Sequence, residues 1–267
     1  MTHPLEIRTD GRKNKVKIEY MADGYQLVKS KKKGEAWVNL RRPTQEQMLR
    51  PTAVSSYVSS LSDVASDFVD MYLNEGQIDD LKSAMSKVVT ESTGMLCFNK
   101  RLGCLEGASV IGSAVANTEL KEATGKIEQA KAEGRLQEFI QGPSLLYALL
   151  THPDMTPEMV QSVILDLFVA GVESTTNVLC FLWYELAKNQ DKQQKLQEEI
   201  ATFGDNNEIT KESLLQMPYL KACVKEIMRQ YPPSPSICRQ LEEDTVINGY
   251  NVSAGVSVFK YLKHEEP

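Results

Sequence analysis

From Pro157 to about Lys188 the chain carries its longest run of helical apolar periodicity, with no further proline to interrupt it. Thr156, Pro157 and Glu158 supply the start, with a hydroxyl cap, a proline in the first turn and an early acid. At about 1.5 Å per residue such a helix is roughly 45 Å long, enough to cross a whole domain. Apolar residues recur in it at spacings of three and four: Met159, Val160, Val163, Ile164, Leu167, Phe168, Val178, Leu179, Leu182 and Leu186. We therefore expect a central helix.

A polar patch, AGVESTTN, interrupts this helix between Ala170 and Asn177. In one interpretation the hydroxyl groups of the patch bond back to helix carbonyls and Glu173 points to solvent. In the other, Gly171 lets a large group lie against the backbone, while an acid and a hydroxyl face a cavity and transfer protons. The patch by itself leaves both interpretations open.

Three further stretches combine residue types that suit a shared site. KEIMRQYP places Glu226 and Arg229 three apart on one helical face, where an ordinary surface ion pair contributes about 0.2–0.5 kcal/mol. GEAWVNLRR places Trp37 and Arg41 one helical turn apart, so that an indole N–H and a guanidinium can reach one anionic group; the alternative is the start of an amphipathic helix. SPSICRQ places Arg239 after a proline-rich turn, which by itself indicates nothing.

The other elements predict a mainly α fold with a small β component, in a single partial domain over residues 1–267. The polar residues 1–20 are expected to be disordered, and residues 103–142 to form surface helices and loops. Periodicity, caps and turn residues place the elements as follows: helices at 51–73, 77–98 (ending near Gly94), 191–203, 210–216 and 218–230, and strands at 245–247, 250–252 and 256–261.

Composition limits the classes of function that the chain can serve. A net charge of −6 disfavours nucleic acid as a partner. Asp166 and Glu173 interrupt the best candidate for a membrane span. The three histidines lie far apart and in no metal-binding spacing. The cysteines form no CxxC pair, which indicates reduced thiols: Cys97, Cys104, Cys180, Cys223 and Cys238.

In this order and with these separations, the four stretches resemble the cytochrome P-450 family of haem-thiolate monooxygenases. AGVESTTN is similar to the oxygen-activating segment of the family's long central helix, and KEIMRQYP to its ExxR segment. The likeness extends from about Tyr20 onward. Four segments look like sterol- and vitamin D-type hydroxylases of the mitochondrial branch: MLRPTAVSSYV, FNKRLGCLEG, LLTHPDMTPEMV and YLKACVKEIMRQYP. The resemblance implies the cytochrome P-450 fold, incomplete at both ends, with haem (iron protoporphyrin) as cofactor.

The resemblance also implies roles for the residues of the central patch. Gly171 would let the porphyrin and dioxygen approach the helix, Ser174 would bond to the dioxygen, and Glu173 would relay protons. The family usually has threonine where this chain has Ser174, and serine lacks the methyl group that restricts χ1. Thr175 is the substitute hydroxyl.

For the other stretches, the resemblance implies contacts with the edge of the haem and a structural pair. Trp37, Arg41 and Arg239 match positions that bind the haem propionates. Glu226 and Arg229 match a pair that belongs to the structural core on the proximal side of the haem.

Mitochondrial members of the family receive electrons from a small acidic iron–sulfur ferredoxin. Lys221 and Lys225 lie four apart on one helical face and match the lysines that dock it; two solvated lysines are the alternative. The substrate implied is small and hydrophobic, a sterol or another lipid. The location implied is the matrix side of the mitochondrial inner membrane with peripheral membrane association, although no transit peptide is recognised.

The family holds its iron through a cysteine in a Phe-x-x-Gly-x-x-x-Cys-x-Gly loop, and the 267 residues contain no such motif. We therefore expect a fragment that is inactive by itself, since the thiolate favours O–O cleavage. Two alternatives come from other classes. One is a catalytically inactive helical interaction protein derived from the family, and the other is an unrelated helical scaffold whose motif matches are accidental.

Overall fold

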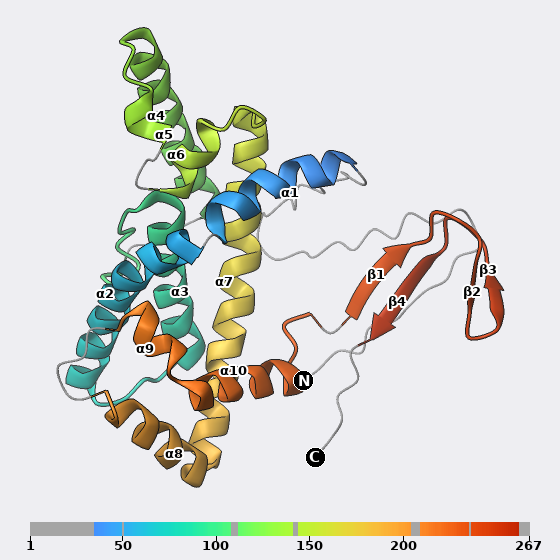
Figure 1. Ribbon diagram of the computed structural model, residues 1–267. Coiled ribbons are helices and arrows are strands. Elements are labelled where there is room, and N and C mark those ends of the chain that lie inside the picture. The colour runs from blue at the N-terminus through green and yellow to red at the C-terminus, as the bar shows by residue number, and fades with distance from the viewer. Residues whose placement is uncertain are drawn as a thin grey trace. The chain divides into compact units, whose positions relative to one another are not determined.

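The computed structural model describes residues 35–49, 51–107, 112–140, 144–203, 209–234 and 236–261, all in the unit Lys32–Pro267 (Figure 1). The expectation for residues 1–20 lies outside this described part of the chain. The mainly α fold with a small β component is confirmed, with these elements: α1 Glu35–Met48, α2 Pro51–Glu75, α3 Leu81–Phe98, α4 Gly112–Ala132, α5 Gln137–Ile140, α6 Leu145–Leu150, α7 Pro157–Lys188, α8 Gln190–Ala201, α9 Lys211–Leu215, α10 Pro218–Gln230, β1 Ser236–Gln240, β2 Thr245–Ile247, β3 Tyr250–Val252 and β4 Ser257–Tyr261.

Helix α7, the long yellow helix of Figure 1, is the predicted central helix. The Met159 backbone N–H donates to Thr156 Oγ1 at 3.3 Å, which confirms the predicted cap. The helix packs against α1, α3, α4, α6, α8 and α10. Among the described helices, α7 alone has the length and hydropathy of a membrane-spanning segment. Only 22% of its most apolar window is buried, although the helix packs against six others.

Two clusters of buried side chains meet on α3 and α7. The larger one joins α3, α6 and α7 with residues of α1 and α4: Leu40, Cys97, Phe98, Ala116, Ala123, Leu145, Leu146, Leu149, Met155, Val160, Val163, Ile164 and Phe168. The second joins α2 and α3, with part of α7 packed against it: Val64, Phe68, Ala84, Met85, Val88, Val89 and Leu105. The face of α7 opposite these clusters stays exposed at Asp166, Ala170 and Glu173.

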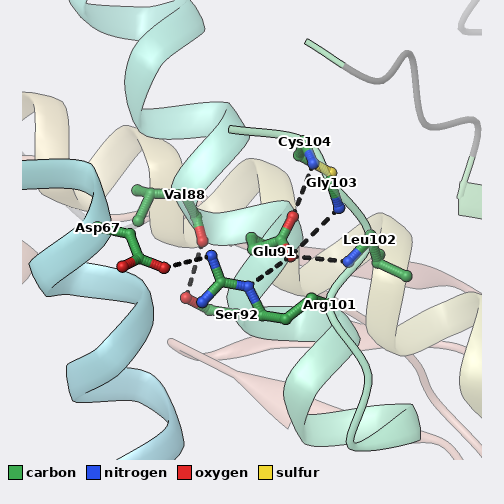
Figure 2. A network of polar contacts seen from close by, with 8 residues as sticks. All are labelled: Asp67, Val88, Glu91, Ser92, Arg101, Leu102, Gly103 and Cys104. Atoms are coloured by element: carbon green, nitrogen blue, oxygen red, sulfur yellow. Dashed lines mark hydrogen bonds and ion pairs between the residues drawn. The ribbon is translucent and has the colours of Figure 1, made fainter. Parts of the chain in front are cut away.

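A buried carboxylate organises the turn that follows α3 (Figure 2). Glu91 is fully buried, and its oxygens accept hydrogen bonds from the backbone N–H groups of Leu102 at 2.7 Å, Gly103 at 3.3 Å and Cys104 at 2.7 Å. Arg101 Nε donates to the same carboxylate at 2.9 Å, and Arg101 Nη2 reaches Asp67 of α2 at 2.8 Å. The turn is therefore tied to α3 and to α2 at once.

Gly94 lies inside α3, so the prediction that this helix ends near Gly94 is wrong. The helix continues to Phe98 and closes at Asn99, whose φ is 52°. A Cβ on Gly94 would lie 2.6 Å from both Cγ and Cδ1 of Leu102, the residue whose N–H Glu91 holds. Glycine is required here by a close approach between the helix and the turn after it.

We expect Gly94→Ala to lower the free energy of unfolding by about 1–3 kcal/mol, because the added methyl group displaces Leu102. Gly125 in α4 is a matched control, since a Cβ there meets no atom within 4 Å. Gly125→Ala is expected to raise the free energy of unfolding by up to about 1 kcal/mol through helix propensity. Urea denaturation of both variants measures the difference, and a stabilising effect of both substitutions would contradict the close packing at Gly94.

The C-terminal strands form two antiparallel pairs. The predicted hairpin is confirmed as β2 and β3, joined by Asn248 and Gly249 with φ values of 49° and 84°. Strand β4 pairs with β1, with Cys238 opposite Phe259. Strand β1 was not predicted, because its only sequence signal is a short run after prolines.

Candidate active site

The patch on α7 combines a back-bonded hydroxyl with open space beside a glycine. Ser174 Oγ donates its hydrogen to the carbonyl oxygen of Ala170 at 2.6 Å, one turn earlier. A Cβ built on Gly171 would meet no atom within 4 Å. The back-bonding of the first interpretation therefore occurs at Ser174, and the space beside the glycine is open, while the cavity of the second interpretation stays a prediction. With its hydrogen held by Ala170, the Ser174 oxygen is left as an acceptor of hydrogen bonds.

The three consecutive hydroxyl residues point in different directions, because successive helical residues are about 100° apart. Ser174 is half-buried, whereas Thr175 and the residue before the triplet, Glu173, are both exposed. Thr176 is 3% exposed, and its Oγ1 has no hydrogen-bond partner within the described residues. The interpretation in which the hydroxyl groups of the patch bond back to helix carbonyls is therefore wrong for Thr176.

The structure places the predicted haem-contacting residues on different elements. Trp37 lies in the first turn of α1, and its side chain lies outside what the structure describes. Arg41 is exposed on α1, a helix that packs against α7. Arg239 is exposed on β1, where Nη1 donates to the Cys238 carbonyl at 2.9 Å. Among the described residues no hydrogen bond or ion pair joins Arg239 to α1 or α7.

Two hollows on the described surface lie away from these residues. One, of about 420 Å³, borders α3 and has this lining: Asp80, Lys82, Ser83, Ser86, Lys87, Thr90 and Cys104. The other, of about 750 Å³, lies along α4. Neither is lined by a predicted site residue, so the convergence of Trp37, Arg41, Arg239, Glu173 and Ser174 on one hollow stays a prediction.

The predicted ion pair on α10 forms with two-point geometry. Arg229 Nε and Nη2 donate to the two carboxylate oxygens of Glu226 at 2.8 and 2.7 Å. Gln230 Nε2 adds a third hydrogen bond at 2.8 Å. The hydrogen bonds from Arg229 and then from Gln230 lower the pKa of Glu226 to about 2. Both side chains of the pair are about half exposed.

Both ends of α10 are held by other helices. At its start, the carboxylate of Glu199 on α8 accepts hydrogen bonds from the backbone N–H groups of Tyr219 and Leu220. At its end, the Tyr231 ring stacks on Phe181 of α7 with centroids 4.1 Å apart. The Tyr231 hydroxyl also donates to Glu185 of α7 at 2.6 Å. Sequence reasoning missed Glu199 and Tyr231, because their partners lie 20 and more residues away.

The two predicted docking lysines are both exposed on α10. Lys221 Nζ donates to the carbonyl oxygen of Leu215, the last residue of α9, at 3.1 Å. That bond uses one of three ammonium hydrogens, so the positive charge of Lys221 stays at the surface beside that of Lys225.

Four of the five described cysteines lie in surroundings that disfavour the thiolate, which is the form that binds metal, and the fifth, Cys238, is exposed on β1. Burial raises the pKa of Cys97 to about 12, and burial together with the Glu91 carboxylate raises that of Cys104 to about 12. Burial raises the pKa of Cys180 and of Cys223 as well. These four thiols are therefore held protonated. The space beside Gly171 on α7 is open, so a flat group has room against that turn of the helix, whereas the four thiols are in the form that does not bind iron.

The helical architecture around α7 defines the class of fold. The chain superimposes on the cytochrome P-450DA heme domain with a TM-score of 0.71 and 16% sequence identity, over 82% of this chain and 54% of that one. This similarity shows the fold. Residues 126–264, more than half of the chain, match the family model described as cytochrome P-450. The chain belongs to the cytochrome P-450 family.

Curated relatives include three from animals. Cytochrome P-450 10 of Lymnaea stagnalis is 29% identical, over 92% of this chain and 53% of the relative. The mitochondrial 1,25-dihydroxyvitamin D(3) 24-hydroxylase of Rattus norvegicus is 27% identical, over 83% of this chain and 51% of the relative. The mitochondrial sterol 26-hydroxylase of the same organism is 25% identical, over 81% of this chain and 50% of the relative. The chain thus resembles the mitochondrial branch and spans about half the length of these relatives.

Proposed function

We propose that this chain contributes the oxygen-activating helix of a haem-dependent monooxygenase that hydroxylates a small hydrophobic substrate. Membership of the cytochrome P-450 family supports the reaction class. Relatives named as a vitamin D 24-hydroxylase and a sterol 26-hydroxylase support a sterol or another lipid as the substrate class. Since the chain spans about half their length, the proposal concerns what α7 and α10 contribute to such a site.

The observation that carries the proposal is the arrangement of Gly171 and Ser174 on α7. The open space beside Gly171 lets a flat macrocycle lie against the helix backbone. Ser174 Oγ accepts a hydrogen bond from a hydroxyl or water in the site, because its own hydrogen is held by Ala170. Glu173 passes protons toward Ser174, and Thr175 is the substitute hydroxyl. Haem, when bound, supplies the binding and reduction of dioxygen.

Two further groups of residues complete the proposed site. Trp37, Arg41 and Arg239 bind the haem propionates, since an indole N–H and guanidinium groups suit carboxylates. Lys221 and Lys225 dock an acidic ferredoxin-type electron donor by charge complementarity, and their exposure on α10 supports this role. The names of the mitochondrial relatives support a mitochondrial location, at the matrix side of the inner membrane.

The 267 residues by themselves do not hydroxylate in this proposal, because they do not contain the Phe-x-x-Gly-x-x-x-Cys-x-Gly motif with which the family holds its iron. The test is the absorbance spectrum of the reduced, carbon-monoxide-treated protein. We expect no red-shifted Soret band from the 267 residues and a red-shifted band when the same residues stand in a polypeptide with the family's cysteine loop. A thiolate band from the 267 residues would overturn the proposed inactivity, and its absence from the longer polypeptide would overturn haem-thiolate function.

In that longer polypeptide, Ser174→Ala is expected to lower product formation about 10²-fold or more, while the red-shifted band stays unchanged. The reason is the loss of the hydroxyl that accepts a hydrogen bond on the side of the haem where dioxygen binds. Ser174→Thr, which restores the hydroxyl, is the matched control. Unchanged product formation in Ser174→Ala with Thr175 intact would assign the role to Thr175, and the Ser174→Ala/Thr175→Val double variant would then show the loss.

A second candidate is a helical interaction protein without catalysis. The observation in its favour is the exposure of Trp183 and Tyr184 on α7, at 53% and 52%. The spectrum described above separates the two candidates, because a protein of this kind gives no thiolate band in either polypeptide.

A further inference from the structure

The first turn of α10 lacks a cap of its own. Met217, at the N-cap position, makes no side-chain capping hydrogen bond, and Pro218 has no N–H to satisfy. The Lys221 N–H is bonded to the Met217 carbonyl at 3.2 Å, which leaves the N–H groups of Tyr219 and Leu220 without partners in their own helix.

Glu199 of α8 satisfies both of these donors. Its Oε1 accepts from the Tyr219 N–H at 2.8 Å and its Oε2 from the Leu220 N–H at 2.9 Å. A negative charge is thereby held at the positive end of the α10 dipole. Lys195, one turn earlier on α8, lies 4.6 Å from the centre of the Tyr219 ring. Both the backbone and the ring of Tyr219 are therefore held by α8.

The opposite end of α10 is held separately, by the contacts of Tyr231 with Phe181 and Glu185 of α7. A helix held at two ends by two different elements has a set direction and rotation. Lys221 and Lys225 lie between these two attachments, and Lys221 is two residues from Tyr219. The orientation of the lysine face thus depends on a residue that is not part of it.

We propose that Glu199 is a positioning residue for the lysine face of α10: it presents Lys221 and Lys225 to an acidic protein partner without touching that partner. The inference rests on the docking role proposed above and adds a residue from another helix to it. Removal of Glu199 leaves both lysines and their charges in place, so any loss of partner affinity reports orientation.

The test compares Glu199→Ala with Glu198→Ala in the polypeptide that also carries the family's cysteine loop. Glu198 is the neighbouring residue, is exposed, and accepts a hydrogen bond from Gln194 of its own helix. Both substitutions change the net charge equally. Two quantities are measured: hydrogen exchange of the Tyr219 and Leu220 amides, and affinity for a small acidic iron–sulfur ferredoxin.

We expect Glu199→Ala to speed exchange of the two amides about tenfold and to weaken ferredoxin binding about three- to tenfold, with Glu198→Ala unchanged in both. Glu199→Gln, whose amide oxygen still accepts a hydrogen bond, is expected to retain part of the exchange protection and part of the ferredoxin affinity that Glu199→Ala loses. Equal ferredoxin affinity in Glu199→Ala and Glu198→Ala would overturn the inference, even if exchange changes.

Lys225→Gln separates this outcome from failure of the docking role itself. If Lys225→Gln weakens ferredoxin binding and Glu199→Ala does not, the docking role stands and the positioning role is wrong. If neither substitution changes the affinity, both roles are wrong, and the exchange rates then show only that Glu199 caps α10.

Discussion

Replacing Glu91 by alanine is expected to lower the free energy of unfolding by about 3–5 kcal/mol, the largest effect of any single substitution considered for this protein. The fully buried carboxylate accepts hydrogen bonds from three backbone N–H groups and from Arg101 (Figure 2). Its loss leaves these donors in a buried turn without an acceptor, and each unsatisfied donor is costly. Urea denaturation of the variant measures the loss.

The matched control removes the exposed end of the same network. Asp67 is 58% exposed and pairs with Arg101, so Asp67→Ala is expected to cost only about 0–1 kcal/mol. Formate or acetate in the buffer is expected to recover part of the stability of Glu91→Ala, because a small carboxylate can bind the donors left free. Similar losses in the two variants would show that the turn depends on the ion pair with α2 instead of on its backbone hydrogen bonds.

The same carboxylate makes stability dependent on pH. Burial raises the pKa of Glu91, but the N–H groups of Cys104, Leu102 and Gly103 and the Arg101 guanidinium outweigh burial, so its pKa is lowered. A lowered folded pKa means that this contribution is fully present above the unfolded pKa, near 4.5, and is lost as the pH falls through the folded value. Glu91→Gln is therefore expected to lack this part of the acid-side loss of stability.

Replacing Gly171 by valine is expected to weaken haem binding about tenfold to a hundredfold in a polypeptide that also carries the cysteine loop. A Cβ on Gly171 meets no protein atom within 4 Å, so the side chain enters the space that the proposed function assigns to the macrocycle. The same fact predicts a change of no more than about 0.5 kcal/mol in the free energy of unfolding without haem, because valine meets no protein atom there and is a slightly better helix former than glycine. Haem titration and urea denaturation measure the two quantities.

Gly125→Val is the matched control for Gly171→Val. Gly125 also lies within a helix with no atom within 4 Å of its Cβ position, but on α4 and apart from the α7 patch. This control is expected to keep full haem affinity. If Gly171→Val also binds haem as the unsubstituted protein does, the macrocycle does not lie against this turn of α7, and the role proposed for Ser174 is wrong with it.

Elements whose signals are local were predictable from the sequence. The periodicity and cap of Pro157–Lys188, the proline that opens α10 and the Asn248-Gly249 turn each act over a few residues, and each element appears where expected. Strand β1 was missed, since its backbone partners are supplied by β4, about 20 residues later. Gly94 was misinterpreted because glycine is favoured both at the ends of helices and where a neighbour approaches the backbone closely.

For the candidate site, the sequence indicated which residue types carry the chemistry but not what each one contacts. It singled out Gly171 and Ser174, and the structure added that Ser174 donates to Ala170 and that the space beside Gly171 is open. It singled out Glu226 and Arg229, whose pairing within one helix follows from their spacing alone. The predicted convergence of Trp37, Arg41 and Arg239 on one site requires contacts between elements, which spacing does not specify.

The sequence by itself determined the family, the long central helix and the residues of the polar patch, because periodicity, caps and motif order are carried by residues close together in the chain. Only the tertiary structure decided that Glu91 holds the turn after α3 and that Glu199 caps α10. An acid in a helix looks the same in sequence whether it faces water or buried N–H groups. The way the helices pack determines which groups the acid contacts, and that packing depends on the whole core.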